Sequence, residues 1–105
     1  MTEAQLLAQV EALADQHNVI FMHNPDSRRT HGLRGFPDVV LCGSEFACAE
    51  LKAIGGTLTQ GQVEWKYRII SSGVAWYLWT PREYESGEIE RVMSALAPHP
   101  SRVPA

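Results

Sequence analysis

The segment RGFPDVVLCGSEFACAELKA, residues 34–53, constrains the fold more strongly than any other part of the chain. It contains two apolar runs, PDVVLCG (37–43) and EFACAELK (45–52), separated by a glycine-serine turn. Two such runs around a short turn are typical of a β-hairpin. Because Val39 to Cys42 are consecutive apolar residues, we expect the first strand to be covered on both faces, like a central strand of an α/β sheet.

Three charged residues, Asp38, Glu50 and Lys52, lie at the open end of this predicted hairpin. Glu50 and Lys52 are two positions apart on one strand, so their side chains leave the same face of the sheet. A three-residue turn pairs Cys42 with Phe46 and places Asp38 opposite Glu50. A two-residue turn sends Asp38 to the other face. The residues alone leave both registers open.

In the first register, two carboxylates lie about 5 Å apart at Cβ and repel each other. A divalent cation between them would relieve the repulsion, and Mg²⁺ suits a site with one or two carboxylates, several waters and a substrate phosphate. Lys52 would then hold an attacking water or offset negative charge on the phosphate. A structural interpretation also stays open, in which Glu50 and Lys52 are polar residues at an exposed strand end.

The other elements are predicted from capping patterns and hydrophobic spacing. We expect a helix at about 2–16, a strand at 18–24, a loop at 25–36, a helix from 59 to about 72, a buried strand at 74–79, and a helical segment from 80 to about 96 with a break at 86–87. Together with the hairpin, this order predicts a three-layer α/β fold in which helices flank a four-stranded mixed sheet.

A chain of 105 residues has room for one domain, which we place at 1–97, followed by a flexible tail at 98–105. No apolar run approaches the roughly 18–20 residues that span a bilayer, and the N-terminus lacks the pattern of an export signal. We therefore expect a cytoplasmic protein without a membrane partner, in which Cys42 and Cys48 are reduced and buried in strands.

Charge alone does not decide whether nucleic acid is a partner. The net charge of −3 argues weakly against it. However, DSRRTHGLR (26–34) places three arginines and a histidine shortly before Asp38. This segment is either a solvated basic loop or a phosphate-binding one.

The charged hairpin also carries a family signature. Pro37-Asp38 followed by Glu50-Leu51-Lys52 matches the pattern of the PD-(D/E)XK nuclease superfamily. The order of the segments HNPDSRRTHGLRGFPDVVL, AELKAIGGTLTQGQVEW and SGVAWYLWTP resembles the VRR-NUC family, especially its short stand-alone phage and bacterial members. The resemblance extends over nearly all of the chain. It implies a restriction-endonuclease-like core and a Mg²⁺- or Mn²⁺-dependent endodeoxyribonuclease.

The resemblance also assigns the residues of a metal site. It implies that Asp38 and Glu50 are metal ligands and that the backbone carbonyl of Leu51 completes the coordination. It further implies that Lys52 is the catalytic lysine.

Two further site residues follow from the resemblance, each with a structural alternative. The family has a glutamate on its first helix that acts through waters on the metal, and Glu3 matches it better than Glu11. An acidic residue in a first helical turn is also stabilised by the helix dipole alone. Gln62 matches the family's glutamine near the site, but a capping box with Thr59 uses the same side chain, so the two roles compete.

The family's H…DSRR segment is matched by residues 23–29. The arginine fork suits phosphate, and the resemblance implies DNA contacts from the loop residues Ser27, Arg28, Arg29 and Arg34. His23 is interpreted as a core histidine at a strand end and not as a ligand.

Glycines and tryptophans around the site are interpreted more simply. Gly35 is expected to let the backbone approach the site closely. Gly61, inside the first turn of a predicted helix, costs up to about 1 kcal/mol of helix stability and has no role in this interpretation. Trp65 and Trp76 are expected in the core, and Trp79 is the one candidate for stacking on a base.

The short family members resemble Holliday-junction resolvases, which implies a four-way junction or other branched DNA as substrate and a role in recombination and repair. Paired nicks by a chain with one site require a symmetric homodimer. The second and third helices carry more apolar residues than one sheet face needs, so we expect the stripe of one of these two helices to face a second chain. These residues are Trp65, Tyr67, Ile69 and Ile70 on the second helix and Ile89, Val92 and Met93 on the third. The alternatives are a catalytically silent DNA-binding or assembly module and a nuclease subunit of a larger phage or repair complex.

Overall fold

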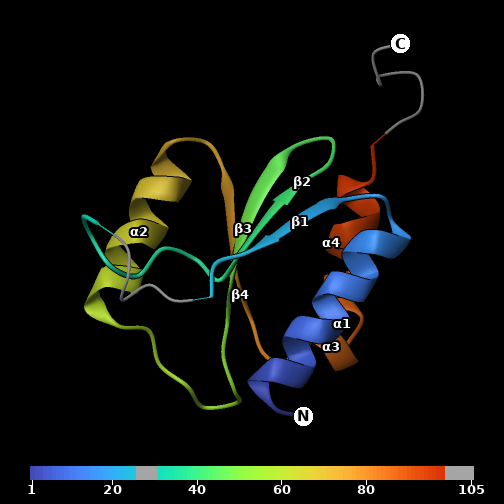
Figure 1. Ribbon diagram of the computed structural model, residues 1–105, viewed down its shortest axis with the longest axis horizontal. Coiled ribbons are helices and arrows are strands. Elements are labelled where there is room, and N and C mark those ends of the chain that lie inside the picture. Colours follow the sequence, from blue (N-terminus) through green and yellow to red (C-terminus); the bar gives the residue numbers. More distant parts are fainter. Residues whose placement is uncertain (26–30, 99–105) are drawn as a thin grey trace.

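A four-stranded mixed sheet organises the protein in the computed structural model, which describes residues 1–25 and 31–98 (Figure 1). Three strands are antiparallel neighbours, and the fourth runs parallel to the third. In sheet order these are β1 (Ile20–His23), β2 (Val39–Cys42), β3 (Phe46–Leu51) and β4 (Ala75–Trp79). The predicted mixed sheet of four strands is therefore confirmed. Most of the predicted C-terminal tail, from residue 99 onward, lies outside the described residues.

Helices cover the two faces of the sheet unequally. The helices are α1 (Glu3–Gln16), α2 (Gln60–Ser71), α3 (Pro81–Glu85) and α4 (Glu88–Leu96). Figure 1 shows α1, α3 and α4 together on one side of the sheet and α2 alone on the other. The predicted three-layer α/β architecture is confirmed. No helix in the described ranges is long and apolar enough to cross a membrane.

The hydrophobic core lies between the sheet and the layer of α1, α3 and α4. Leu6, Val10 and Ala14 form the inward face of α1 at helical spacing. They pack against side chains from β2, β3, β4 and α4: Val39, Leu41, Ala47, Ala49, Leu51, Trp79, Ile89, Met93 and Leu96. Ile89 and Met93 are fully buried within the chain. Of the two helix stripes expected to be able to face a second chain, the stripe of the last helix therefore belongs to the core.

Three helices begin with a threonine N-cap, as the sequence predicts. In each capping box the threonine oxygen accepts a backbone N–H from the first turn, while the N3 side chain accepts the N–H of the threonine. The pairs are Thr2 with Gln5, Thr59 with Gln62, and Thr80 with Glu83. Pro81 occupies the first turn of α3, where its missing N–H costs nothing.

The β2–β3 hairpin adopts the three-residue turn. Cys42 pairs with Phe46 and Val39 pairs with Ala49. One step further along the same register, Asp38 lies opposite Glu50. The backbone carbonyl of Asp38 accepts the N–H of Asn24 at 2.7 Å, which extends the pairing of β1 with β2 to the aspartate.

Burial of the strands differs from the prediction. On β2, Val39 and Leu41 are buried, but Val40 and Cys42 are only half-buried. The reason is that α2 packs against β4 and leaves much of the β1–β2 side of its face uncovered. The strand predicted as buried at 74–79 is β4, an edge strand on which Trp79 alone is fully buried.

The predicted strand at 18–24 is shorter than expected. Asn18 has a φ of 58° and ends α1, and the N–H of Val19 donates to Ala14 O at 2.8 Å. These two residues therefore form the helix terminus, and β1 begins at Ile20.

The segment before β2 lies against the first turn of α2. Gly35 is buried and has a φ of 108°, and a Cβ atom placed on it would lie 2.5 Å from the backbone N of Gln62. A Cβ atom on Gly61 would in turn collide with the carbonyl of Arg34. The Trp65 indole N–H donates to Leu33 O at 2.9 Å. Glycine at positions 35 and 61 therefore lets two backbones touch, which confirms the close approach predicted for Gly35.

Gly35→Ala should lower the free energy of unfolding by about 1–3 kcal/mol more than Gly32→Ala does. Both glycines have positive φ, but a Cβ atom at Gly32 meets no heavy atom within 4 Å, so this control isolates the steric term. Urea denaturation of the two variants measures the difference. Equal losses would mean that the loop and helix do not touch in solution.

Candidate active site

The Asp38 carboxylate is anchored across the open end of the hairpin. Its Oδ2 atom accepts the backbone N–H of Leu51 at 2.8 Å. A backbone donor favours the ionised form of a carboxylate and fixes its direction. Asp38 is half-buried, whereas its partner across the hairpin, Glu50, is almost fully buried.

Glu50 is the one charged residue in the core of the described chain, at 2% exposure. Its Oε1 atom accepts the side-chain N–H of Gln62 at 2.9 Å. Its Oε2 atom is buried and has no hydrogen-bond partner among the described residues. A buried carboxyl oxygen without a partner is costly unless another group, such as a cation, satisfies it.

Burial raises the pKa of Glu50 to about 9. The negative charge of the nearby Asp38 carboxylate raises it further, because it disfavours the ionised form of Glu50. The nearby Lys52 charge opposes these effects, and Glu3 adds a weaker repulsion. Without a cation, Glu50 is therefore protonated at neutral pH.

Lys52 follows β3 directly and stays beside the sheet. Its backbone N–H donates to Trp79 O at 3.0 Å, which continues the pairing of β3 with β4. The side chain is half-buried, and its charge acts on Glu50. The structure thus brings Asp38, Glu50 and Lys52 to one end of the sheet.

Gln62 performs both of the roles that were expected to compete. Its Oε1 atom accepts the Thr59 N–H at 2.8 Å in the capping box, and its Nε2 atom donates to Glu50. The expectation of competition was wrong because a primary amide has an acceptor end and a donor end.

Helix α1 contributes Glu3 and not Glu11. Glu3 lines a cavity of about 270 Å³ together with Asp38, Leu51 and His23, whereas Glu11 lies at a different hollow with Asp15. Figure 1 shows the N-terminal ends of α1 and α2 at the same end of the sheet. Their partial positive charges favour negative groups there.

His23 was interpreted as a core residue, and this is wrong. It is exposed at the end of β1 and lines the same cavity as Asp38. The period-2 alternation of β1 directs Phe21 toward the core, and His23 lies at the strand's open end. The sequence did carry a signal for this position, since His23 begins the H…DSRR segment on which the family resemblance was based.

Other predicted residues lie outside the site or outside the described residues. Ser27, Arg28 and Arg29 fall in the segment 26–30, which the structure does not describe. Arg34 is exposed, and its carbonyl faces Gly61. Trp79 is fully buried, so its proposed stacking on a base is wrong.

The donor set suits a hard cation that keeps much of its water. Within residues 1–25 and 31–98, no three His, Cys, Asp or Glu side chains converge as a preformed metal cage. Asp38 and Glu50 offer two carboxylates, and the orphaned Glu50 Oε2 requires a partner. Mg²⁺ and Mn²⁺ accept such a site, since one or two carboxylates, a backbone carbonyl and waters are sufficient for them.

Comparison of the chain with family models, with curated proteins and with solved structures found no match.

Glu50→Gln should flatten the pH dependence of stability in metal-free protein. Between the unfolded pKa near 4.5 and the folded pKa of about 9, the folded state holds a proton that the unfolded chain releases. The free energy of unfolding of the wild type therefore falls as pH rises through this window. Urea denaturation with EDTA at pH 5, 7 and 9 measures the slope.

The control is Glu45→Gln, which changes an exposed glutamate in the turn of the same hairpin. It should keep the wild-type pH dependence. Parallel curves for the wild type and Glu50→Gln would show that Glu50 is ionised in the folded protein without metal.

Proposed function

We propose that this protein is a Mg²⁺- or Mn²⁺-dependent endodeoxyribonuclease that hydrolyses backbone phosphodiesters, with four-way junctions or other branched DNA as its preferred substrate. The observation that carries the proposal is the opposition of Asp38 and Glu50, with Lys52 two residues beyond Glu50 on the same strand end. The order of motifs that resembles the VRR-NUC nucleases supports the same reaction.

Asp38, Glu50 and the carbonyl of Leu51 would hold the metal ion. When bound, the ion supplies Lewis-acid stabilisation of the scissile phosphate and of the departing 3′-oxygen. Glu50 has to release its proton to become a ligand. Gln62 assists this change, because its N–H donor stabilises the carboxylate form.

Lys52 acts on the reacting groups. Its ammonium group can donate a hydrogen bond to the attacking water, which orients the oxygen toward the phosphorus. The same charge offsets the negative charge that grows on the phosphate as the P–O bond forms. The water then attacks in line, and the bond to the 3′-oxygen breaks.

The DNA backbone would approach over the cavity and the loop that precedes β2. Glu3, His23 and Asp38 line the cavity, so a phosphate near Asp38 lies beside the start of α1. Arg34 is exposed on the loop. Arg28 and Arg29, which lie outside the described residues, precede it in the sequence and are proposed to contact neighbouring phosphates.

A homodimer would provide the two active sites that paired cleavage of a junction needs. The proposed interface is the open sheet surface, which consists of exposed apolar side chains from β1, β3 and α2: Ile20, Met22, Phe46, Tyr67 and Ile70. Phe46 and Ile70 line one hollow with Val74 and Ala75. Exposed apolar side chains gathered in this way are typical of interfaces.

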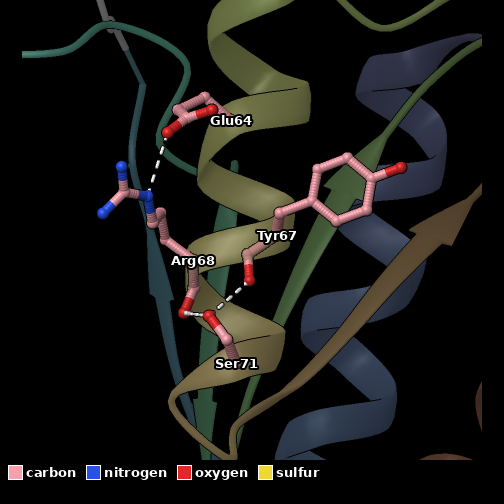
Figure 2. Close-up of polar contacts among 4 residues, drawn as sticks. All are labelled: Glu64, Tyr67, Arg68 and Ser71. Carbon is pink, nitrogen blue, oxygen red and sulfur yellow. Dashed lines mark hydrogen bonds and ion pairs between the residues drawn. The ribbon is translucent and has the colours of Figure 1, made fainter.

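Helix α2 has one side that suits this interface and one that does not. Figure 2 shows Tyr67 pointing away from the Glu64–Arg68 ion pair, whose N–O distance is 2.9 Å. Tyr67 is 62% exposed and Arg68 has 76% side-chain exposure. A partner would therefore cover the side with Tyr67 and Ile70, and the charged side would remain in solvent.

Asp38→Ala and Glu50→Ala should each abolish metal-dependent cleavage, because each removes one of the two carboxylates proposed to hold the metal ion, while the fold survives. Lys52→Ala should keep Mn²⁺ binding and cleave about 10²–10³-fold more slowly. The measurements are cleavage of labelled four-way junction, flap and linear duplex with Mg²⁺, Mn²⁺ or EDTA, and Mn²⁺ titration calorimetry.

Glu45→Ala, in the turn at the far end of the hairpin, is the matched control and should cleave like the wild type. Undiminished cleavage by both carboxylate variants would refute the metal site. Loss of Mn²⁺ binding in Lys52→Ala to the same degree as its loss of rate would assign the lysine a structural role.

Phe46→Glu should dissociate the dimer, because a charge buried at an apolar interface has no partner. Ile54→Glu is the control, since Ile54 is equally exposed, at 60%, but lies on the connection between β3 and α2. Sedimentation at micromolar concentration measures both. A wild-type species of 11.7 kDa alone, with junctions still cut in pairs, would contradict the dimer.

A further inference from the structure

The side-chain amide of Gln62 is held at both of its ends. Thr59 donates its backbone N–H to Gln62 Oε1 at 2.8 Å, and the Thr59 hydroxyl oxygen accepts the backbone N–H of Gln62 at 3.2 Å. The other end of the amide, Nε2, donates to Glu50 Oε1 at 2.9 Å. A chain of hydrogen bonds thus connects the N-cap of α2 to the buried carboxyl of the site.

This chain fixes the orientation of the amide. The Thr59 N–H is only a donor, so it can bond to Gln62 Oε1 but not to Nε2. If the amide flipped, its NH₂ group would face the Thr59 N–H and its oxygen would face the Glu50 carboxylate. Both contacts would be lost, so the capping box determines that a donor points at Glu50.

Capping alone does not require glutamine at this position. In α3 the same box is built from Thr80 and Glu83, whose Oε1 atom accepts both the N–H and the hydroxyl of Thr80 at 2.8 Å. A carboxylate at position 62 would cap α2 equally well but could not donate to an ionised Glu50. Only an amide satisfies both the cap and the site.

The backbone beneath the amide is also held in place. Gly35 lies against the backbone N of Gln62, and Gly61 lies against the Arg34 carbonyl, so the first turn of α2 is in backbone contact with the loop before β2. The position of the Gln62 side chain therefore depends on Thr59 and on this contact.

We infer that Thr59 is a positioning residue for the metal site: it fixes the Gln62 amide, and the amide directs the Glu50 carboxylate at the cation. The inference rests on the proposed nuclease function for its catalytic consequence. Partners that orient metal ligands typically contribute about 10–100-fold in metal affinity or activity. Thr59 is expected to contribute in this range.

The decisive comparison is between Thr59→Ala and Thr80→Ala. Each variant removes the hydroxyl of one capping box, so both should lower the melting temperature to a similar degree. Thr59→Ala keeps the backbone N–H that bonds to Gln62 Oε1, but it loses the hydroxyl that holds the Gln62 backbone N–H at 3.2 Å. Without that hydroxyl the first turn of α2 frays, and the Gln62 amide is no longer kept within reach of both the Thr59 N–H and Glu50. Only Thr59→Ala should reduce kcat with Mn²⁺ and weaken Mn²⁺ binding, by about 10–100-fold. Thr59→Ser restores the hydroxyl and should recover both, whereas Gln62→Glu should keep the cap and lose both.

A second measurement does not depend on cleavage. In ¹⁵N NMR spectra, the side-chain NH₂ signals of Gln62, assigned by their absence in Gln62→Ala, should be sharp and slow to exchange in the wild type. They should broaden in Thr59→Ala and stay unchanged in Thr80→Ala.

The outcomes separate the inference from the proposed function. If the wild type binds Mn²⁺ but cleaves no DNA, and Thr59→Ala but not Thr80→Ala weakens Mn²⁺ binding and broadens the Gln62 signals, the nuclease proposal fails and the positioning role of Thr59 stands. If the wild type cleaves, and Thr59→Ala matches Thr80→Ala in kcat, Mn²⁺ affinity and the Gln62 signals, the inference is overturned.

Discussion

Pairing of Cys42 with Phe46 across the turn of the hairpin determines which side chains meet at its other end. Since side chains alternate between faces, a shift of one residue would move Asp38 away from Glu50 and place apolar core residues in solvent. The register that buries Val39, Leu41 and Ala49 is therefore the same one that opposes the two carboxylates. Packing of the core and assembly of the site are set by one constraint.

The energetic cost of this arrangement is concentrated on Glu50. Its carboxyl group is 2% exposed and lies opposite another carboxyl group, and both conditions disfavour the ionised form. The pKa of Glu50 is therefore raised to about 9. Gln62 supplies a donor, Lys52 supplies a charge, and the starts of α1 and α2 add partial positive charge. Among residues 1–25 and 31–98, one oxygen of Glu50 still has no hydrogen-bond partner. In sites that bind a cation, a ligand oxygen often has no hydrogen-bond partner in the protein, because the bound cation takes that place.

The sequence was sufficient to predict those features that are determined by residues close together in the chain. The capping boxes of three helices and the glycine-serine turn depend on residues close in the chain, and the structure confirms them. Burial of β2 and β4 could not be predicted, since it depends on which strand α2 packs against. Trp79 was misjudged because it belongs to the core that the sheet forms with the layer of α1, α3 and α4, a contact between segments distant in the sequence. The sequence analysis expected the cap and the site to compete for the Gln62 side chain. The structure shows that they use different ends of the amide, and the directions of these two ends cannot be read from the sequence.

Gly61 shows how a local cost can be explained by a contact that is distant in sequence. A glycine in the first turn of a helix lowers helix stability by about 1 kcal/mol, and composition offers no reason for it. The reason is the carbonyl of Arg34, which occupies the space that a Cβ atom would need. Because of this contact, the loop that carries Arg34, the helix start that carries Gln62 and the strand that follows Asp38 are held as one unit. A DNA phosphate bound by the loop would therefore be placed at a fixed position relative to the carboxylates, which is what in-line attack on a phosphodiester requires.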